Sequence, residues 1–172
     1  TDVFRPADKV IKQPFILNVA NDFKNRGHLL GFDLWMKTVN GLNHILLGDT
    51  TGISSPSKSV EDLVNHYQQA TVFLNCSTLS PIPSVVMEAS ACGTAVVSTD
   101  TCAISEYVEH GVSGFLSNDE NELRYYVEYL LNNPDKAVEM GMAGREIMKN
   151  KFPLSNFVNQ WNEVFGNATN LI

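Results

Sequence analysis

The chain has 172 residues, of which 44% are hydrophobic and 18% are charged, and its net charge is −7. This composition fits one globular domain, excludes a disordered chain, and offers no run of the ~20 apolar residues that an integral membrane segment needs. The negative charge argues against nucleic acid as a partner, because phosphate backbones recruit basic surfaces.

Alternating apolar and helical patterns run through most of the chain. Five apolar runs predict strands: FILNVA (15–20), HILLGD (44–49), TVFLN (71–75), AVVST (95–99) and GFLS (114–117). Helical patterns lie between them, at 28–39, 60–69, 83–92 and 104–110. Because the strand runs are continuously apolar, both faces of the sheet should be covered. The order predicts an α/β fold: a three-layer α/β/α, Rossmann-like, doubly wound parallel sheet.

The pattern is helical throughout after the last predicted strand. Asn118 or Asp119 can cap a helix at 120–131, and Pro134 can open the next one. Ser155 can cap a final helix, whose aromatic residues recur four apart and share one face: Phe157, Trp161 and Phe165. We expect this face to dock on its own domain. The alternative is that it reaches a neighbour outside the chain.

These patterns divide the chain into three parts. Residues 1–12 are expected to be the remnant of a connector between domains, 13–152 a Rossmann-like domain, and 153–172 a C-terminal helix. The three cysteines form no CxxC pair and have apolar or small neighbours: Cys76, Cys92 and Cys102. Buried free thiols and a cytoplasmic location are therefore expected, without a metal site or a disulfide framework.

Positive charge is concentrated in the first part of the chain. Residues 1–60 carry seven Lys and Arg against five Asp and Glu, whereas 61–172 carry five against fourteen. An anion site is therefore expected in the first part or on backbone N–H groups. The residues after the first predicted strand include Asn21, Lys24 and Arg26. Arg26 is the better candidate for bidentate phosphate contact, and a solvated turn is the alternative.

A single acid, Glu88, stands in the otherwise apolar or small stretch PIPSVVMEASACGTAVVST (81–99). It lies past the first turn of the predicted helix, where the helix dipole fades, and on the side that should face protein. A carboxylate in that place needs hydrogen-bond donors. Ligands of open parallel sheets bind where strands lead into helix N-termini, so two ribose hydroxyls could supply those donors. A structural hydrogen bond to a neighbouring loop is the alternative.

The same helix should begin near Pro83. That start leaves the N–H groups of Ser84, Val85 and Val86 without partners inside the helix, which makes an anion site. Gly93 is expected to end the helix in the left-handed conformation. The loop 49–59 follows the second predicted strand and is expected to border a nucleobase.

These residues together resemble the C-terminal, donor-binding domain of the retaining GT-B glycosyltransferases of family 4. ILNVANDFKNRG (16–27) is similar to that family's first strand and basic loop, and HYQQATVFLNCS (66–77) to its next conserved segment. EASACGTAVVSTDTCAISEYVEHGVSGFL (88–116) is similar to its long signature. The resemblance implies a glycosyltransferase that moves a hexose-type sugar from a nucleoside diphosphate sugar, without a cofactor or metal. The acceptor would be held by an N-terminal domain outside this chain.

The resemblance also implies roles for particular residues. Glu88 would bind the ribose, Arg26 with Lys24 the diphosphate, and the N–H groups of Ser84 and Val85 would lie at the helix start. No catalytic residue is assigned, and the domain alone is expected to bind the donor without transferring the sugar.

Several positions depart from the family pattern: Pro83 replaces the Gly of its acidic loop, and Cys102 and Ala103 replace the Gly pair after its fourth strand. Ser80 stands where the family has the first Glu of its acidic pair, which holds sugar hydroxyls, and Asn21 replaces a phosphate-binding Arg. A non-catalytic nucleotide-sugar or protein-interaction module is therefore the alternative function. A dinucleotide oxidoreductase is disfavoured because no GxGxxG follows the first strand.

Overall fold

A five-stranded parallel sheet forms the centre of the molecule. The computed structural model describes residues 3–9, 11–79 and 83–169. The strand order is β2-β1-β3-β4-β5, and each neighbouring pair is parallel. The strands are β1 (Gln13–Val19), β2 (His44–Leu47), β3 (Ala70–Asn75), β4 (Ala95–Ser98) and β5 (Gly114–Leu116). Each coincides with a predicted strand to within about two residues at either end.

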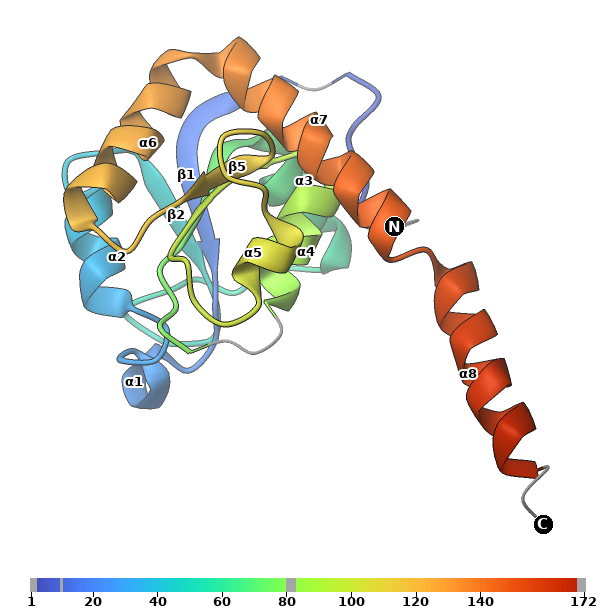
Figure 1. Cartoon of the computed structure of the whole chain (residues 1–172). Coiled ribbons are helices and arrows are strands. Elements are labelled where there is room, and N and C mark those ends of the chain that lie inside the picture. The colour runs from blue at the N-terminus through green and yellow to red at the C-terminus, as the bar shows by residue number, and fades with distance from the viewer. Residues whose placement is uncertain (1–2, 10, 80–82, 170–172) are drawn as a thin grey trace.

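Helices cover both faces of this sheet, which confirms the predicted three-layer α/β/α fold (Figure 1). They are α1 (Phe23–Arg26), α2 (Phe32–Val39), α3 (Val60–Gln69), α4 (Ser84–Ala91), α5 (Ile104–Tyr107), α6 (Glu120–Asn132), α7 (Pro134–Lys151) and α8 (Leu154–Thr169). Two boundary predictions are wrong: the helix expected at 104–110 ends at Tyr107, and the helix expected at 28–39 begins only at Phe32. Gly31, with φ +64°, precedes it in the left-handed conformation that favours glycine.

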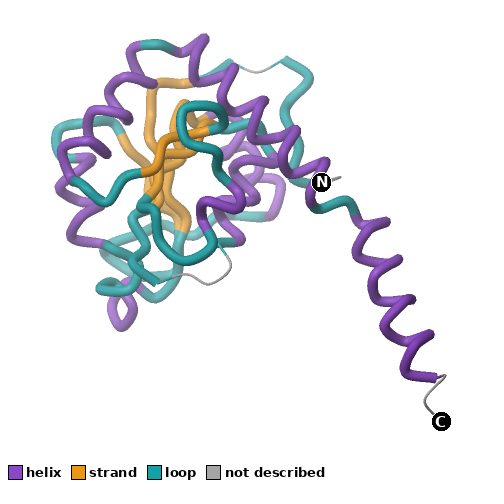
Figure 2. The backbone as a smooth tube through the Cα atoms, viewed as in Figure 1, coloured by secondary structure: helices purple, strands orange, loops and turns teal. Residues whose placement is uncertain are grey.

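Successive strand residues supply two separate cores. Phe15 and Leu17 of β1 pack with α3, α4 and α5, whereas Ile16 faces α2 and α6. This alternation explains why the strand sequences are apolar without interruption: both sides of each strand are buried. Figure 2 shows the strands enclosed between helices on either side.

The long helix α7 belongs to both cores. Ala137 and Met140 in its first half pack into the core beneath α2 and α6, and Met148 near its end packs into the other. The crossing is close, because a Cβ atom on Gly141 would lie 2.2 Å from the carbonyl oxygen of Gly93. Gly93 has φ +73°, which confirms the predicted left-handed cap after α4.

The predicted caps of the C-terminal helices are partly confirmed. Asp119 caps α6, its Oδ1 accepting hydrogen bonds from the N–H groups of Asn121 and Glu122 at 2.8 and 3.0 Å. Pro134 opens α7 as predicted. Ser155 caps nothing, because α8 begins at Leu154 and includes Ser155 in its first turn.

Helix α8 extends away from the body of the molecule (Figure 1). Its aromatic residues are exposed: 58% for Phe157, 46% for Trp161 and 61% for Phe165. The prediction that this face docks on its own domain is therefore wrong, and the rings instead pack along the helix. Among the helices that the structure describes, none has the length and hydropathy required to cross a bilayer.

The N-terminal segment and the cysteines complete the comparison with the sequence. The segment before β1 is held against the domain: Gln68 Nε2 donates to the Arg5 carbonyl at 2.6 Å, and an Arg145 guanidinium nitrogen to the Phe4 carbonyl at 3.0 Å. All three thiols are free, as predicted. Cys76 and Cys92 are buried, but Cys102 is exposed in a turn, which corrects the expectation that all three lie inside.

Candidate functional site

The strand order places a crevice between the ends of β1 and β3. The chain leaves β1 toward β2 on one side and later returns to β3 on the other side, so the connections that follow these two strands diverge. In open parallel sheets, ligands bind at such a switch point, outside the carboxyl ends of the strands.

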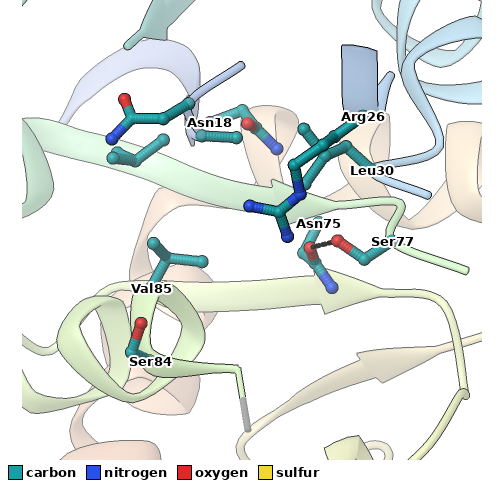
Figure 3. Close-up of a pocket in the computed structure, with 10 residues that line it drawn as sticks. Asn18, Arg26, Leu30, Asn75, Ser77, Ser84 and Val85 are labelled. Carbon is teal, nitrogen blue, oxygen red and sulfur yellow. Dashed lines mark hydrogen bonds between the residues drawn. The ribbon is translucent and has the colours of Figure 1, made fainter. Parts of the chain in front are cut away.

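A cavity of about 270 Å³ lies at this point. Its lining combines residues from the ends of both strands, from α1 and from the start of α4: Asn18, Val19, Ala20, Asn21, Arg26, Leu30, Asn75, Ser77, Ser84 and Val85. Figure 3 shows Arg26 extending into this space from one side, with Ser84 and Val85 on the other. Arg26 brings the only positive charge to the described lining.

Arg26 is positioned by a short helix tied to the neighbouring loop. The N–H of Asp22 donates to Asp49 Oδ1 at 2.7 Å, and the N–H of Phe23 donates to Thr50 Oγ1 at 2.9 Å. Phe23 is buried and packs against Phe32, with ring centroids 5.1 Å apart. These contacts fix α1 beside the cavity. The Arg26 side chain stays exposed, so its guanidinium can bind a charged ligand.

The opposite wall is the first turn of α4. Pro83 precedes the helix, and its carbonyl accepts from the N–H groups of Val86 and Met87 at 2.9 and 3.1 Å. Helix geometry therefore leaves the N–H groups of Ser84 and Val85 as the two without an intrahelical partner. The expectation that Val86 also offers its N–H to a ligand is wrong. The two remaining groups carry the positive end of the helix dipole at the cavity wall.

Asn75 and Ser77 belong to a buried polar network behind the cavity. Asn75 Nδ2 donates to Ser98 Oγ at 2.9 Å, while its Oδ1 accepts from Ser77 Oγ at 2.8 Å. Ser98 Oγ and Thr99 Oγ1 donate in turn to carbonyl groups, at 2.9 and 2.7 Å. The side-chain amide of Asn75 is thus bonded on both sides, and it makes this part of the lining rigid.

A second cavity, of about 210 Å³, adjoins the first. Val19 and Asn21 line both cavities, and the loop after β2 contributes Asp49, Pro56 and Ser57 to the second. The loop 49–59 thus lines a cavity, and its place beside a nucleobase stays a prediction. Together the two cavities reach the range of roughly 300–1,000 Å³ that is typical of sites for small ligands.

Glu88 lies on α4 one turn beyond Ser84, outside the lining of these two cavities. Its Oε2 accepts a hydrogen bond from the hydroxyl of Tyr67 on α3, at 2.9 Å. The carboxylate is half-buried beside a smaller cavity of about 190 Å³, whose walls include Phe4, Met148 and Phe152. The Tyr67 contact explains part of why an acid stands here, because Tyr67 is fully buried and its hydroxyl needs a partner.

The surroundings of this pair shift both of its pKa values. Burial raises the pKa of Glu88 above its usual value of 4.5, and the hydrogen bond from Tyr67 partly offsets that rise. Burial, with the nearby Glu88 carboxylate, also raises the pKa of Tyr67 well above its usual value. The hydroxyl therefore stays protonated and continues to donate at neutral pH.

The structure brings together four of the seven residues that the sequence singled out: Asn21, Arg26, Ser84 and Val85. Lys24 is exposed on α1 and Glu88 lies behind the first turn of α4, and neither lines the main cavity. Ser80 lies outside the described residues. Sequence reasoning missed Asn18 and Asn75, although each is a polar residue at the end of an apolar strand. Over the residues that the structure describes, no group of three or more His, Cys, Asp or Glu could hold a metal ion.

Comparison with solved structures identifies the fold. Sucrose-phosphate synthase from Thermosynechococcus elongatus superimposes with a TM-score of 0.81 at 18% identity, covering 99% of this chain and 51% of that one. HepE from Anabaena, solved in complex with UDP-glucose, gives a TM-score of 0.75 at 17% identity, covering 96% and 55%. The fold is that of one domain of a GT-B glycosyltransferase.

The sequence identifies the family. The chain belongs to the glycosyl transferases group 1, whose family model matches residues 44–147. It is also 34% identical, over 118 residues, to an alpha-maltose-1-phosphate synthase from Mycolicibacterium smegmatis. That alignment covers 64% of this chain and 30% of the relative, so the chain spans about a third of the length of that protein.

Proposed function

We propose that this chain is the donor-binding domain of a retaining glycosyltransferase of family 4. It binds a nucleoside diphosphate sugar at the switch point of its sheet, and the hexose-type sugar passes to an acceptor held by an N-terminal domain. Membership of the glycosyl transferases group 1 and the UDP-glucose complex of HepE both support this class of ligand.

One observation carries the proposal: a guanidinium and the start of a helix face the same cavity. Arg26 reaches it from α1, and the N–H groups of Ser84 and Val85 begin α4 on the other side. A diphosphate between them would meet a bidentate cation and a positive helix end together. In an acidic chain, that convergence at the carboxyl ends of parallel strands favours an anionic ligand.

The chemistry of the leaving group gives these residues their part in the reaction. When the bond from the anomeric carbon to the phosphate oxygen breaks, negative charge grows on the diphosphate. Arg26 and the oriented N–H groups of α4 are positioned before the reaction, so they stabilise that charge more in the transition state than in the ground state. The sugar's electrophilic carbon would face the acceptor domain.

Glu88 is proposed to bind the ribose. Its Oε2 is engaged by Tyr67, so Oε1 is the atom that would accept from a ribose hydroxyl. With the nucleobase beside the loop 49–59 and the diphosphate at Arg26, the ribose would lie near the start of α4. Reaching it from Glu88 requires the carboxylate to turn toward Ser84, one helical turn away.

Calorimetry with this chain tests the proposal. We expect binding of at least one of UDP, ADP and GDP, and the Arg26→Ala variant should bind that diphosphate roughly 10- to 100-fold more weakly, as loss of a hydrogen bond to a charged group predicts. Lys24→Ala is the matched control, because Lys24 is a cation on the same helix outside the cavity lining; it should change the affinity by no more than about twofold. If no diphosphate binds the native chain, the proposal is wrong.

A non-catalytic module remains the second candidate, because the cavity lining is largely uncharged. Asn21 lines the cavity where the family carries an Arg, and Ser80 replaces a Glu in the sequence. The two candidates differ in the full-length protein. An enzyme should transfer the sugar or hydrolyse the donor, and should lose that activity in Glu88→Gln, whereas a module should bind the donor without turnover.

A further inference from the structure

Tyr67 carries a hydroxyl group whose position is fixed by the core. Its side chain is fully buried, and its ring packs against Phe73 and edge-on against Phe4, with ring centroids 5.6 and 6.1 Å apart. Its backbone carbonyl accepts a hydrogen bond from Thr94 Oγ1. Because both the ring and the backbone are held, the hydroxyl cannot follow a partner that moves away from it.

This hydroxyl holds one oxygen of Glu88 and leaves the other free. It donates to Glu88 Oε2 at 2.9 Å, and Oε1 has no hydrogen-bond partner in the described ranges of the chain. The buried side-chain atoms without a partner in those ranges are Asn18 Oδ1 and Trp35 Nε1, so Glu88 Oε1 is not buried. A ligand can therefore reach the carboxylate without first displacing Tyr67.

The bond to Tyr67 keeps Glu88 outside the main cavity. Glu88 borders the smaller cavity together with Phe4 and Phe152. Ser84, one turn earlier on α4, lines the main cavity instead. A ribose near the start of α4 is therefore reached only when the carboxylate turns toward Ser84, away from the place in which Tyr67 holds it.

The ribose competes with Tyr67 for the same oxygen. Its two neighbouring hydroxyls can donate to both oxygens of a carboxylate, and Tyr67 already occupies Oε2 of Glu88. When the ribose takes that oxygen, the Tyr67 hydroxyl is left buried without a partner, which costs free energy. The bond thus stabilises the ligand-free chain and lowers its apparent affinity for the nucleotide.

We propose that Tyr67 is a positioning residue, which keeps Glu88 outside the main cavity until the ribose hydroxyls of the nucleotide replace the Tyr67 hydroxyl. The inference rests on the proposed function of Glu88 and adds the contact that opposes it. The bond affects only the part of the affinity that comes from the ribose hydroxyls, because the base and the diphosphate are placed away from Glu88. A nucleotide without those hydroxyls leaves the pair intact.

The test compares nucleotides that differ only in the ribose hydroxyls. The native chain and Tyr67→Phe are titrated by calorimetry with UDP, ADP and GDP and with their 2′,3′-dideoxy forms. Phenylalanine keeps the ring in the core and removes the hydroxyl. We expect Tyr67→Phe to bind the matching diphosphate about 3- to 10-fold more tightly, as loss of one competing hydrogen bond predicts, and to change the affinity for its dideoxy form by less than about twofold.

Two further variants separate this effect from a change in packing. Tyr107→Phe removes the hydroxyl of another buried tyrosine, which lies on α5 and lines neither the main cavity nor the one beside Glu88. It should change neither affinity. Glu88→Ala removes the carboxylate, so adding Tyr67→Phe to that variant should no longer tighten binding. Tightening by Tyr107→Phe, or by Tyr67→Phe without the carboxylate, would contradict the role of Tyr67.

A measurement on the native chain keeps the test valid if Tyr67→Phe fails to fold. The carboxylate carbon resonance of Glu88 should shift when the diphosphate is added and stay in place with its dideoxy form. Weaker or unchanged binding of the diphosphate by Tyr67→Phe, equal tightening of both forms, or equal shifts of the Glu88 resonance would overturn the role of Tyr67. Binding of no diphosphate by the native chain would instead overturn the proposed function itself.

Discussion

The ends of β1 and β3 hold two buried asparagines that differ in one respect. Asn75 uses both ends of its side-chain amide, donating to Ser98 and accepting from Ser77. Asn18 donates to Leu74, but its oxygen has no partner in the part of the chain that the structure describes. Both line the same cavity. The difference teaches that a buried polar group paired on both sides stabilises the fold, whereas an acceptor buried without a partner costs free energy.

Removing the satisfied asparagine should have the largest effect on stability. Asn75→Leu leaves Ser77 and Ser98 without their partner in a buried place, so the free energy of unfolding should fall by about 2 to 4 kcal/mol. Urea unfolding measures this. Asn65→Leu, at an exposed position on α3, is the control and should stay within about 0.5 kcal/mol. Equal effects of the two changes would remove the distinction.

Asn18→Leu should cost less, because it removes an unpaired acceptor together with one hydrogen bond. We expect a loss of about 1 kcal/mol in the free energy of unfolding. Urea unfolding measures this loss. A loss as large as that of Asn75→Leu would contradict the comparison.

The pair formed by Tyr67 and Glu88 is a satisfied contact of the same kind as Asn75. Tyr67→Phe should lower the free energy of unfolding by about 0.5 to 1 kcal/mol, because Glu88 is half-buried and water can replace the hydroxyl. The same change should raise the pKa of Glu88 further, since the hydrogen bond from Tyr67 counteracts the rise caused by burial. NMR titration of Glu88 reports it, and a fall in that pKa would contradict the assignment.

Glu88→Gln should have the smallest effect on the free energy of unfolding, and that effect should change with pH. Burial raises the pKa of Glu88 in the folded chain above 4.5, so the native chain loses stability as pH rises from about 4.5 through that raised pKa. Glutamine does not ionise and its oxygen can still accept from Tyr67. The free energy of unfolding of the Glu88→Gln variant should therefore increase relative to that of the native chain as pH rises across this window.

Glu61→Gln provides a control with the opposite sign. The Ser59 side chain lowers the pKa of Glu61, which is exposed on the first turn of α3. The ionised group therefore stabilises the folded chain above 4.5, and that contribution is lost as pH falls through the lowered pKa. The free energy of unfolding of the Glu61→Gln variant should decrease relative to that of the native chain as pH rises. The same trend in both variants would show that the two pKa shifts do not have these causes.

Much of the fold and part of the site could be predicted from the sequence because they depend on local patterns. Continuous apolar runs identify strands buried on both faces, and parallel strands bring the residues after β1 and before α4 to one edge. Arg26 and Ser84 were found in this way. Knowledge of the fold type was enough to place these two residues, and no knowledge of side-chain contacts was needed.

What the sequence did not reveal depends on partners far along the chain. Glu88 meets Tyr67, which is 21 residues away on another helix, and no spacing rule predicts that pair. Asn18 reads as one polar residue in an apolar strand, and only the structure shows that one of its two polar atoms is paired. The aromatic face of α8 has the same periodicity whether its partner lies inside or outside the chain, so the pattern of Phe157 and Trp161 could not decide between them.

The close crossing of α7 over Gly93 couples the two layers of helices. One half of α7 closes the core beneath α2 and α6 and the other half closes the core beneath α3 and α4, so neither layer can detach without displacing the same helix. We expect the domain to open as one cooperative unit, with amides of β1 and β3 exchanging at a common slow rate set by global unfolding. The cavity lined by Arg26 lies at the opposite end of the sheet from this crossing, so the loops around it can adjust without loosening the core.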